Sequence, residues 1–147
     1  DGHELAGRRV LEVGSGRGGG AAMLTRCHCP IEYVAMDLNH AQVAFAREHL
    51  SRGRPCPLDF VQGDAHALPF QDASFDVVLN VESSHFYPDF ERFANEAIRV
   101  LRVGGALLIA DFRSRHLVDI TASTLGRVFE QEVVPVDVSR AVAKAKG

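Results

Sequence analysis

The sequence predicts an α/β domain in which helices cover both faces of a doubly wound, mainly parallel sheet. Three observations lead to this fold class. Short apolar runs alternate with segments of helical periodicity from residue 8 to residue 112. A glycine-rich turn, Gly14–Gly20, follows the first run. Polar residues follow each later run, and ligands of such sheets bind beyond the carboxyl ends of the strands.

Five strands and two of the helices follow from the pattern in order. The strands are the apolar runs at 8–13, 31–37, 57–64, 75–81 and 106–112. A first helix is expected over 19–27. A second is expected over 39–50, where Asn39 and Gln42 have the spacing of a capping box.

A third helix is expected to begin near Asp89 and to end at Gly104 and Gly105. Its apolar residues recur at helical spacing and would form one buried stripe. They are Phe90, Phe93, Ala94, Ala97, Ile98 and Leu101.

The glycine-rich turn fits two ligand-binding patterns. Gly14, Gly16 and Gly19 match Gly-x-Gly-x-x-Gly, the fingerprint of nicotinamide and flavin enzymes. Glu12, Gly14, Gly16 and Gly18 match acidic-x-Gly-x-Gly-x-Gly, which indicates a protein that binds S-adenosylmethionine. The turn alone leaves both interpretations open.

Two features favour S-adenosylmethionine, Glu12 and the segment 63–70 after the third strand, whereas Asp37 suits either cofactor. Glu12 lies inside the end of the first strand, where a carboxylate is a poor neighbour for a pyrophosphate and a good one for an ammonium and a sulfonium. Asp37 follows the second strand and can accept from both ribose hydroxyls, which either cofactor offers. Its charge also disfavours the 2′-phosphate of NADP.

The segment after the third strand supplies candidate adenine contacts. Asp64 can accept from the exocyclic amine, and the Ala65 N–H can donate to a ring nitrogen. Leu38 with Ala65 or Leu68 can sandwich the ring.

Four segments in order, 10–20, 35–39, 63–89 and 100–112, resemble the motifs of class I S-adenosylmethionine-dependent methyltransferases. The resemblance implies a Rossmann-like fold, methyl transfer, and S-adenosylmethionine as cofactor with S-adenosylhomocysteine as product. It implies that the turn carries the methionine part, Asp37 binds ribose and Asp64 binds the adenine amine. The expected cofactor-binding residues are Glu12, Gly14, Ser15, Gly16, Gly18, Asp37, Leu38, Asp64, Ala65 and Asn80.

The segment after the fourth strand points to the methyl acceptor. Asn80–Ser83 lacks the Asn-Pro-Pro-Tyr type of sequence found in families that methylate nucleobases or amides. Residues 81–89 resemble small-molecule O-methyltransferases that act on sugar, polyketide or lipid hydroxyls. Related sugar O-methyltransferases imply that His85 and Asp111 are catalytic, with His85 as general base. C- or N-methylation of a small molecule is the alternative.

Three other interpretations stay open. A metal held by Asp111, Asp89 and Glu82 would acidify the hydroxyl, although no metal site is predicted. An NAD-dependent oxidoreductase would use the first glycine pattern. A catalytically inactive module would bind the cofactor without turnover.

Composition sets the remaining expectations. The 147 residues carry a net charge of −3 with scattered basic residues, so no nucleic-acid partner is expected. No apolar run approaches the roughly 18 residues of a membrane helix, and no membrane partner is expected. Cys27, Cys29 and Cys56 suggest no disulfide framework, which is typical of a reduced, cytoplasmic protein. The Cys27-His28-Cys29 spacing is not that of a zinc site.

One domain is expected over 1–147, with core motifs at 10–112 and a remodelled or discontinuous tail at 113–147. Residues 117–121 resemble the family's sixth strand, but the helix that should precede it is absent. We therefore expect a break between about Phe112 and Leu117. Residues 132–147 match the last strand poorly, and helices that cover the acceptor are absent before the first strand. The sequence is expected to start inside a longer protein.

Overall fold

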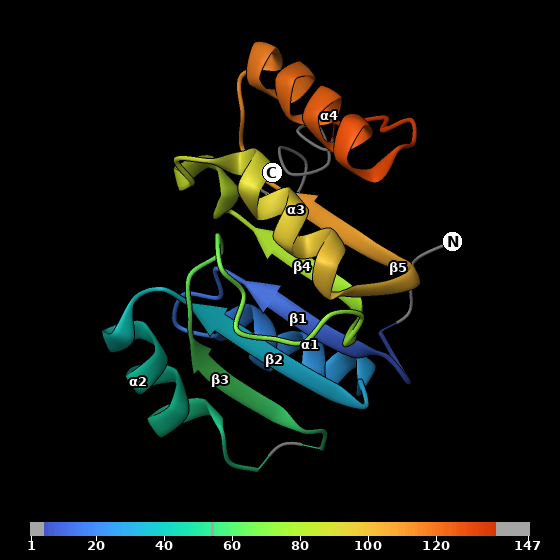
Figure 1. Ribbon diagram of the computed structural model, residues 1–147. Coiled ribbons are helices and arrows are strands. Elements are labelled where there is room, and N and C mark those ends of the chain that lie inside the picture. Colours follow the sequence, from blue (N-terminus) through green and yellow to red (C-terminus); the bar gives the residue numbers. More distant parts are fainter. Residues whose placement is uncertain (1–4, 54, 138–147) are drawn as a thin grey trace, which may run out of the picture. The chain divides into compact units, whose positions relative to one another are not determined.

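Five parallel strands form one sheet in the order β3-β2-β1-β4-β5 (Figure 1). The strands are β1 (Arg9–Val13), β2 (Glu32–Asp37), β3 (Leu58–Gln62), β4 (Phe75–Val81) and β5 (Leu101–Ala110). This computed structural model describes residues 5–53 and 55–137. It divides into two units, Asp1–Phe112 and Arg113–Gly147, and the sheet belongs to the first.

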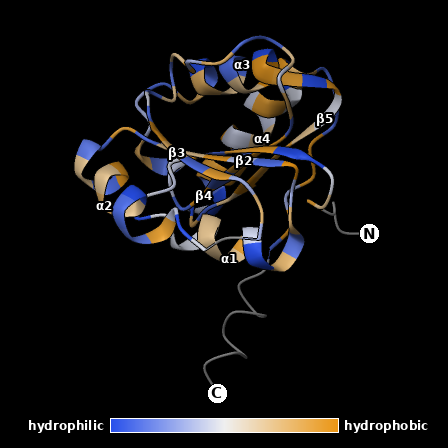
Figure 2. Cartoon of the chain, turned by 90° about the horizontal axis from the view of Figure 1, so that it is seen from below, coloured by the Kyte–Doolittle hydropathy of each residue, from blue (hydrophilic) through white to orange (hydrophobic). Residues whose placement is uncertain are grey.

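Helices lie on both faces of the sheet, which confirms the expected fold class. They are α1 (Gly19–His28), α2 (His40–Leu50) and α3 (Phe90–Val100). Seen nearly edge-on, the sheet has α1 and α2 on one side and α3 on the other (Figure 2). The chain fills β1, β2 and β3 in one direction and then returns to β4 on the other side of β1. Strand order therefore reverses between β1 and β4, where such folds bind ligands.

Apolar side chains from β1 alternate between the two faces. Val10 packs in the core beneath α1 and α2, whereas its neighbour Leu11 points to the other face. On the α3 side, the buried side chains of that helix include Phe93, Ala94 and Ala97, as its apolar stripe predicts. Both faces are thus covered, which explains the nearly continuous apolar runs.

Side-chain caps set two helix starts. The Asn39 side chain accepts from the Ala41 and Gln42 N–H groups, and Asp89 Oδ1 accepts from the Arg92 N–H at 2.9 Å. The predicted Asn39 cap is confirmed. In the expected capping box, the Gln42 side chain would accept from the Asn39 N–H. That N–H donates instead to Asp37 Oδ1 at 2.8 Å, so Asp37 takes the place of Gln42.

The end of α3 differs from the sequence prediction. The helix stops at Val100, and Leu101 already pairs with Phe75 in the sheet. Gly104 and Gly105 belong to β5, where the register with β4 shifts between Phe75 and Val77. A Cβ on Gly105 would come within 2.9 Å of the Asp76 carbonyl oxygen, so this irregular pairing requires glycine there.

In the second unit, α4 (Arg115–Phe129) replaces the expected sixth strand. Ser114 caps it by accepting from the Leu117 N–H, and its apolar residues follow helical spacing rather than the alternation of a strand. Residues 132–137 form no helix or strand, and 138–147 of the expected last strand lie outside the described residues.

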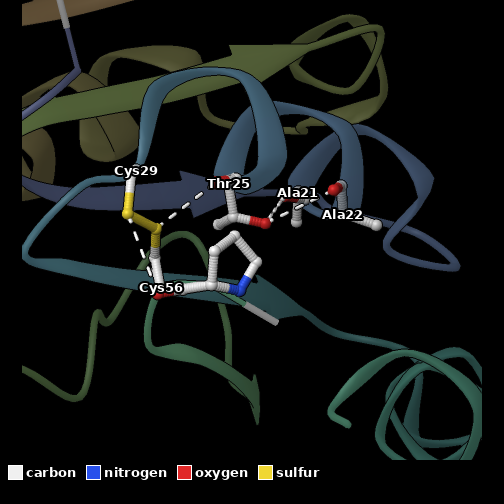
Figure 3. The surroundings of a disulfide bond; sticks show 6 residues. Ala21, Ala22, Thr25, Cys29 and Cys56 are labelled. Carbon is white, nitrogen blue, oxygen red and sulfur yellow. Dashed lines mark hydrogen bonds between the residues drawn. A yellow bond between two sulfur atoms is a disulfide. The ribbon is translucent and has the colours of Figure 1, made fainter. Parts of the chain in front are cut away.

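Cys29 and Cys56 form a disulfide, so the expectation that no cysteines pair is wrong (Figure 3). Their Cα atoms are 5.3 Å apart although 27 residues separate them in sequence. Cys29 ends α1, and the Tyr33 N–H donates to the Pro57 carbonyl, which holds the segment before β3 beside β2. The proximity arises from strand pairing and leaves no local signal in the sequence. Cys27 is exposed and unpaired.

No helix among residues 5–53 and 55–137 is long and apolar enough to cross a membrane.

The disulfide is expected to stabilise the fold by restricting the unfolded chain. For a loop of 27 residues this contribution is about 3.5 kcal/mol. Cys29→Ser should lower the free energy of unfolding by that amount in urea titrations, and a reductant should lower the wild type equally. Cys27→Ser is the matched control and should change nothing. A wild-type midpoint that does not respond to reductant would contradict the assignment.

Candidate functional site

A cavity of about 430 Å³ opens at the carboxyl ends of β1, β2 and β3 and beside the segment after β4. Five of the ten predicted cofactor residues line it: Gly14, Asp37, Leu38, Asp64 and Ala65. The segment after β4 adds Ser83, Phe86, Tyr87 and Pro88. The fold therefore brings the two predicted adenosine-binding carboxylates to one cavity.

The backbone of the glycine turn is held by β2. The N–H groups of Gly14 and Ser15 both donate to the Met36 carbonyl, at 2.8 and 3.0 Å. Gly14 has φ +80°, and a Cβ there would lie 1.9 Å from Ser83 Oγ. Only glycine therefore allows the turn to pass under the segment after β4. Ser15 Oγ is buried and has no hydrogen-bond partner among the described residues.

Asp37 ties the turn to the start of α2. Its Oδ2 accepts from the Gly16 N–H and its Oδ1 accepts from the Asn39 N–H, both at 2.8 Å. Each carboxylate oxygen has a second lone pair, so a diol in the cavity can still be bound. The two bonds fix the rotamer before a ligand arrives.

Asp64 and Ala65 lie in a tight turn that α3 supports. The Ala67 N–H donates to the Asp64 carbonyl at 3.1 Å. Glu96 Oε2 accepts from the Leu68 N–H at 2.7 Å, and Arg99 donates to the Leu68 and Phe70 carbonyls. Arg99 is itself paired with Glu96 at 2.8 Å. Side chains of one helix thus fix the backbone of the predicted adenine-binding turn.

Asn80 holds this end of the sheet together and does not line the cavity. Its side chain is fully buried. Its Nδ2 donates to the Val13 carbonyl and to the Tyr87 hydroxyl, both at 2.9 Å, and its Oδ1 accepts from the Ser84 N–H at 3.0 Å. A cofactor contact of Asn80 stays a prediction.

Tyr87 is a site residue that sequence reasoning missed. Its hydroxyl contacts Ser83 Oγ at 2.9 Å as well as Asn80, and burial raises the pKa of the phenol. Its signal in the sequence was the unusual segment 83–87, but only the fold shows that the ring closes one wall of the cavity.

Glu12 lies on the face of β1 that also carries Val10, whereas its neighbour Val13 lines the cavity. Glu12 is buried, and its Oε2 accepts from the Tyr33 hydroxyl at 2.8 Å. Burial raises the pKa of Glu12 to about 7, although the bond from Tyr33 partly offsets this rise. Glu12 is not among the residues that line the cavity. Its predicted role toward a cationic ligand therefore stays a prediction without a direct contact in the cavity.

His85 and Asp111 are in contact, as the sequence pattern predicts. His85 lies in the 3₁₀ helix η1 (Ser84–Phe86), and its Nδ1 bonds to Asp111 Oδ1. Asp111 Oδ2 accepts from Ser84 Oγ at 2.7 Å and from the His85 N–H at 2.9 Å. The Asp111 side chain is 2% exposed, whereas that of His85 is 29% exposed. The carboxylate is thus held in place and the outer ring nitrogen of His85 can be reached.

The pair lies beside the cavity. Phe86 lines the cavity and packs on the His85 ring with centroids 3.9 Å apart, but His85 is not a lining residue.

Metal binding finds no support in the described residues. They contain no group of three or more histidine, cysteine or acidic side chains that could hold a metal ion. Of the acids in the metal alternative, Asp89 caps α3, Glu82 is exposed and Asp111 binds His85 and Ser84.

Comparison with known proteins agrees with this geometry. The family described as "Methyltransferase domain" matches residues 11–109. Phthiotriol/phenolphthiotriol dimycocerosates methyltransferase 1 of Mycobacterium ulcerans is 48% identical over 136 residues, which cover 88% of this chain and 49% of that protein. Fatty-acid O-methyltransferase of Mycolicibacterium smegmatis is 51% identical over 113 residues, which cover 77% of this chain and 40% of that protein. The chain thus spans half the length of these relatives or less.

A solved structure of similar fold is a SAM dependent methyltransferase from Aquifex aeolicus. It superimposes with a TM-score of 0.74, covering 84% of this chain and 73% of that one, at 20% identity. At this identity the likeness concerns the fold alone.

Glu12 should make the stability depend on pH. Its pKa is 4.5 when unfolded and about 7 when folded, so between these values the folded state keeps a proton that the unfolded state loses. The free energy of unfolding should therefore fall by about 3 kcal/mol as pH rises through this window. Glu12→Gln should remove the fall in urea titrations at pH 5 and pH 8.

Glu82→Gln, at an exposed position, is the matched control and should keep the wild-type pH dependence. An equal fall in Glu12→Gln and wild type would show that another group is responsible.

Proposed function

Since the chain belongs to the methyltransferase domain family, we propose that it transfers a methyl group from S-adenosylmethionine to the oxygen of an apolar, lipid-type small molecule. The expected cofactor is confirmed by this membership. We propose three further points: the class of acceptor, oxygen as the atom that is methylated, and the roles of single residues.

The observation that carries the proposal is the cavity that Asp37 and Asp64 share, which the bare backbone of Gly14 also lines. Two carboxylates suit a nucleoside, because one can accept from the ribose hydroxyls and the other from the adenine amine. The residues present therefore fit S-adenosylmethionine. The buried, unpartnered Ser15 Oγ next to Gly14 is a further group that a ligand can satisfy.

Glycine packing separates the two patterns that the sequence left open. In a dinucleotide fold the third glycine of Gly-x-Gly-x-x-Gly permits close packing of helix and strand. Here a Cβ on Gly19 would meet nothing within 4 Å, whereas one on Gly18 would lie 2.4 Å from the Phe60 ring. The close contact thus falls on the glycine of the acidic-x-Gly-x-Gly-x-Gly pattern. This disfavours the oxidoreductase alternative.

One exposed apolar side chain supports an apolar acceptor. Phe86 lines the cavity, is 77% exposed and is not among the expected cofactor contacts. An apolar chain laid across it would remove this surface from water, which stabilises binding by roughly 25 cal/mol per Å². The two relatives named above carry lipid acceptors in their names, which supports the same class.

Alignment and proton removal are the tasks left to the chain's own residues. Bound S-adenosylmethionine supplies an already activated methyl group. A neutral His85 can take the acceptor's hydroxyl proton on its outer ring nitrogen, while Asp111 holds the inner one and stabilises the charged ring. Ser84 in turn fixes Asp111. A fatty-acid carboxylate would need no such base, so the effect of His85 distinguishes a hydroxyl from a carboxylate acceptor.

Asp37→Ala should weaken binding of S-adenosylhomocysteine far more than it weakens the fold. Loss of the bonds to a ribose diol should cost roughly 2–4 kcal/mol of binding free energy in calorimetric titrations. Asp59→Ala, at an exposed position of β3, is the matched control and should bind as wild type does. Wild-type affinity in Asp37→Ala would place the ribose elsewhere.

His85→Ala should lower kcat by about 10²–10⁴-fold with a hydroxyl acceptor, because general-base removal typically costs that much. Asp111→Asn should also be slow, and the double variant should be little worse than His85→Ala, since paired residues act as a unit. The affinity for S-adenosylhomocysteine should stay unchanged in His85→Ala and in Asp111→Asn. The assay uses the complete protein with its own acceptor.

His40→Ala, on the exposed first residue of α2, should turn over as wild type does. Wild-type turnover in His85→Ala would refute the base and favour an acceptor that is already ionised.

A further inference from the structure

His66 contacts the predicted adenine acid with two donors. Its backbone N–H and its ring Nδ1 both reach Asp64 Oδ1, at 2.8 and 2.9 Å. An ionised carboxylate only accepts, so Nδ1 carries the proton and donates. Both bonds fall on one oxygen, which sets the rotation of the carboxylate and leaves Asp64 Oδ2 without a hydrogen bond from the described residues. The same carboxylate lines the cavity.

The His66 ring is itself fixed. It packs edge-on against the Tyr87 ring with centroids 5.7 Å apart, and its carbonyl accepts from Arg92 Nε at 2.9 Å. The His66 side chain is 15% exposed, whereas that of Asp64 is 53% exposed. A well-held ring therefore controls an acid that would otherwise rotate in solvent.

The ring's other nitrogen is an unusual feature. Nε2 is buried and has no hydrogen-bond partner among the described residues. A half-buried position with no other role would favour an apolar ring here, because an unsatisfied buried acceptor is costly. The donor at Nδ1 gives a reason for histidine.

We propose that His66 is a positioning residue that turns Asp64 Oδ2 toward the exocyclic amine of adenine and thereby sets the site's selectivity for adenine. The inference rests on the S-adenosylmethionine site of the proposed function. Preorganisation raises affinity because the carboxylate does not have to be ordered when the ligand binds. The bonds from His66 also lower the pKa of Asp64, which keeps it ionised as an acceptor.

Two variants separate the donor from the ring. His66→Phe keeps a ring against Tyr87 but removes the Nδ1 donor, whereas His66→Asn keeps a donor near the same place and removes the ring. The probes are S-adenosylhomocysteine and its analogue that carries hydrogen in place of the purine amine. Calorimetry on the complete protein gives all affinities.

We expect His66→Phe to bind S-adenosylhomocysteine about tenfold more weakly than wild type does. This is the loss typical of one charge-assisted hydrogen bond that is partly compensated. The same variant should bind the analogue as wild type does. His66→Asn should retain most of the preference for the amine. If both variants bind both ligands as wild type does, or if His66→Phe weakens both ligands equally, the positioning role is refuted.

The proposed function fails separately. If wild type bound neither probe, the adenosine site and the inference would both be wrong. If wild type bound S-adenosylhomocysteine but the affinities of the His66 variants differed from those expected, the role of His66 would be refuted and the adenosine site would stand.

Discussion

The buried side chain of Asn80 joins the parts on which the site depends. Its amide nitrogen holds the end of β1 through Val13 and the cavity wall through Tyr87, and its oxygen holds the start of η1 through Ser84. A buried amide that makes three hydrogen bonds is costly to disturb. If one bond breaks, polar atoms are left without a partner in a low dielectric. The end of β1, Tyr87 and the start of η1 are thus joined through one residue at the point where strand order reverses.

The strands, the helix starts and the position of the site follow from the sequence, because each depends on a local pattern. Apolar runs gave the five strands, and Asn39 and Asp89 gave two helix starts. Features that depend on pairing across the sheet did not follow. The Cys29–Cys56 disulfide became visible only in the fold. Likewise, Gly104 and Gly105 within β5 resemble a helix end because a local pattern cannot show the β4 partner.

Glu12 matches the sequence motif, but its local contacts differ from those that the motif suggests. The sequence places an acid before the glycine turn, and the structure buries it against Tyr33. Its raised pKa means that a cation bound above the turn would favour ionisation of Glu12, whereas an empty site favours the protonated acid. A long-range electrostatic contribution to cofactor binding is therefore compatible with the absence of direct contact.

The central claim is that one cavity binds an adenosine between Asp37 and Asp64. A crystal structure of the complete protein with S-adenosylhomocysteine tests it most directly. We expect the ribose hydroxyls within hydrogen-bond distance of Asp37, the adenine amine on Asp64 and the sulfur above Gly14. A nucleoside bound elsewhere, or bound in this cavity with its base away from Asp64, would contradict it.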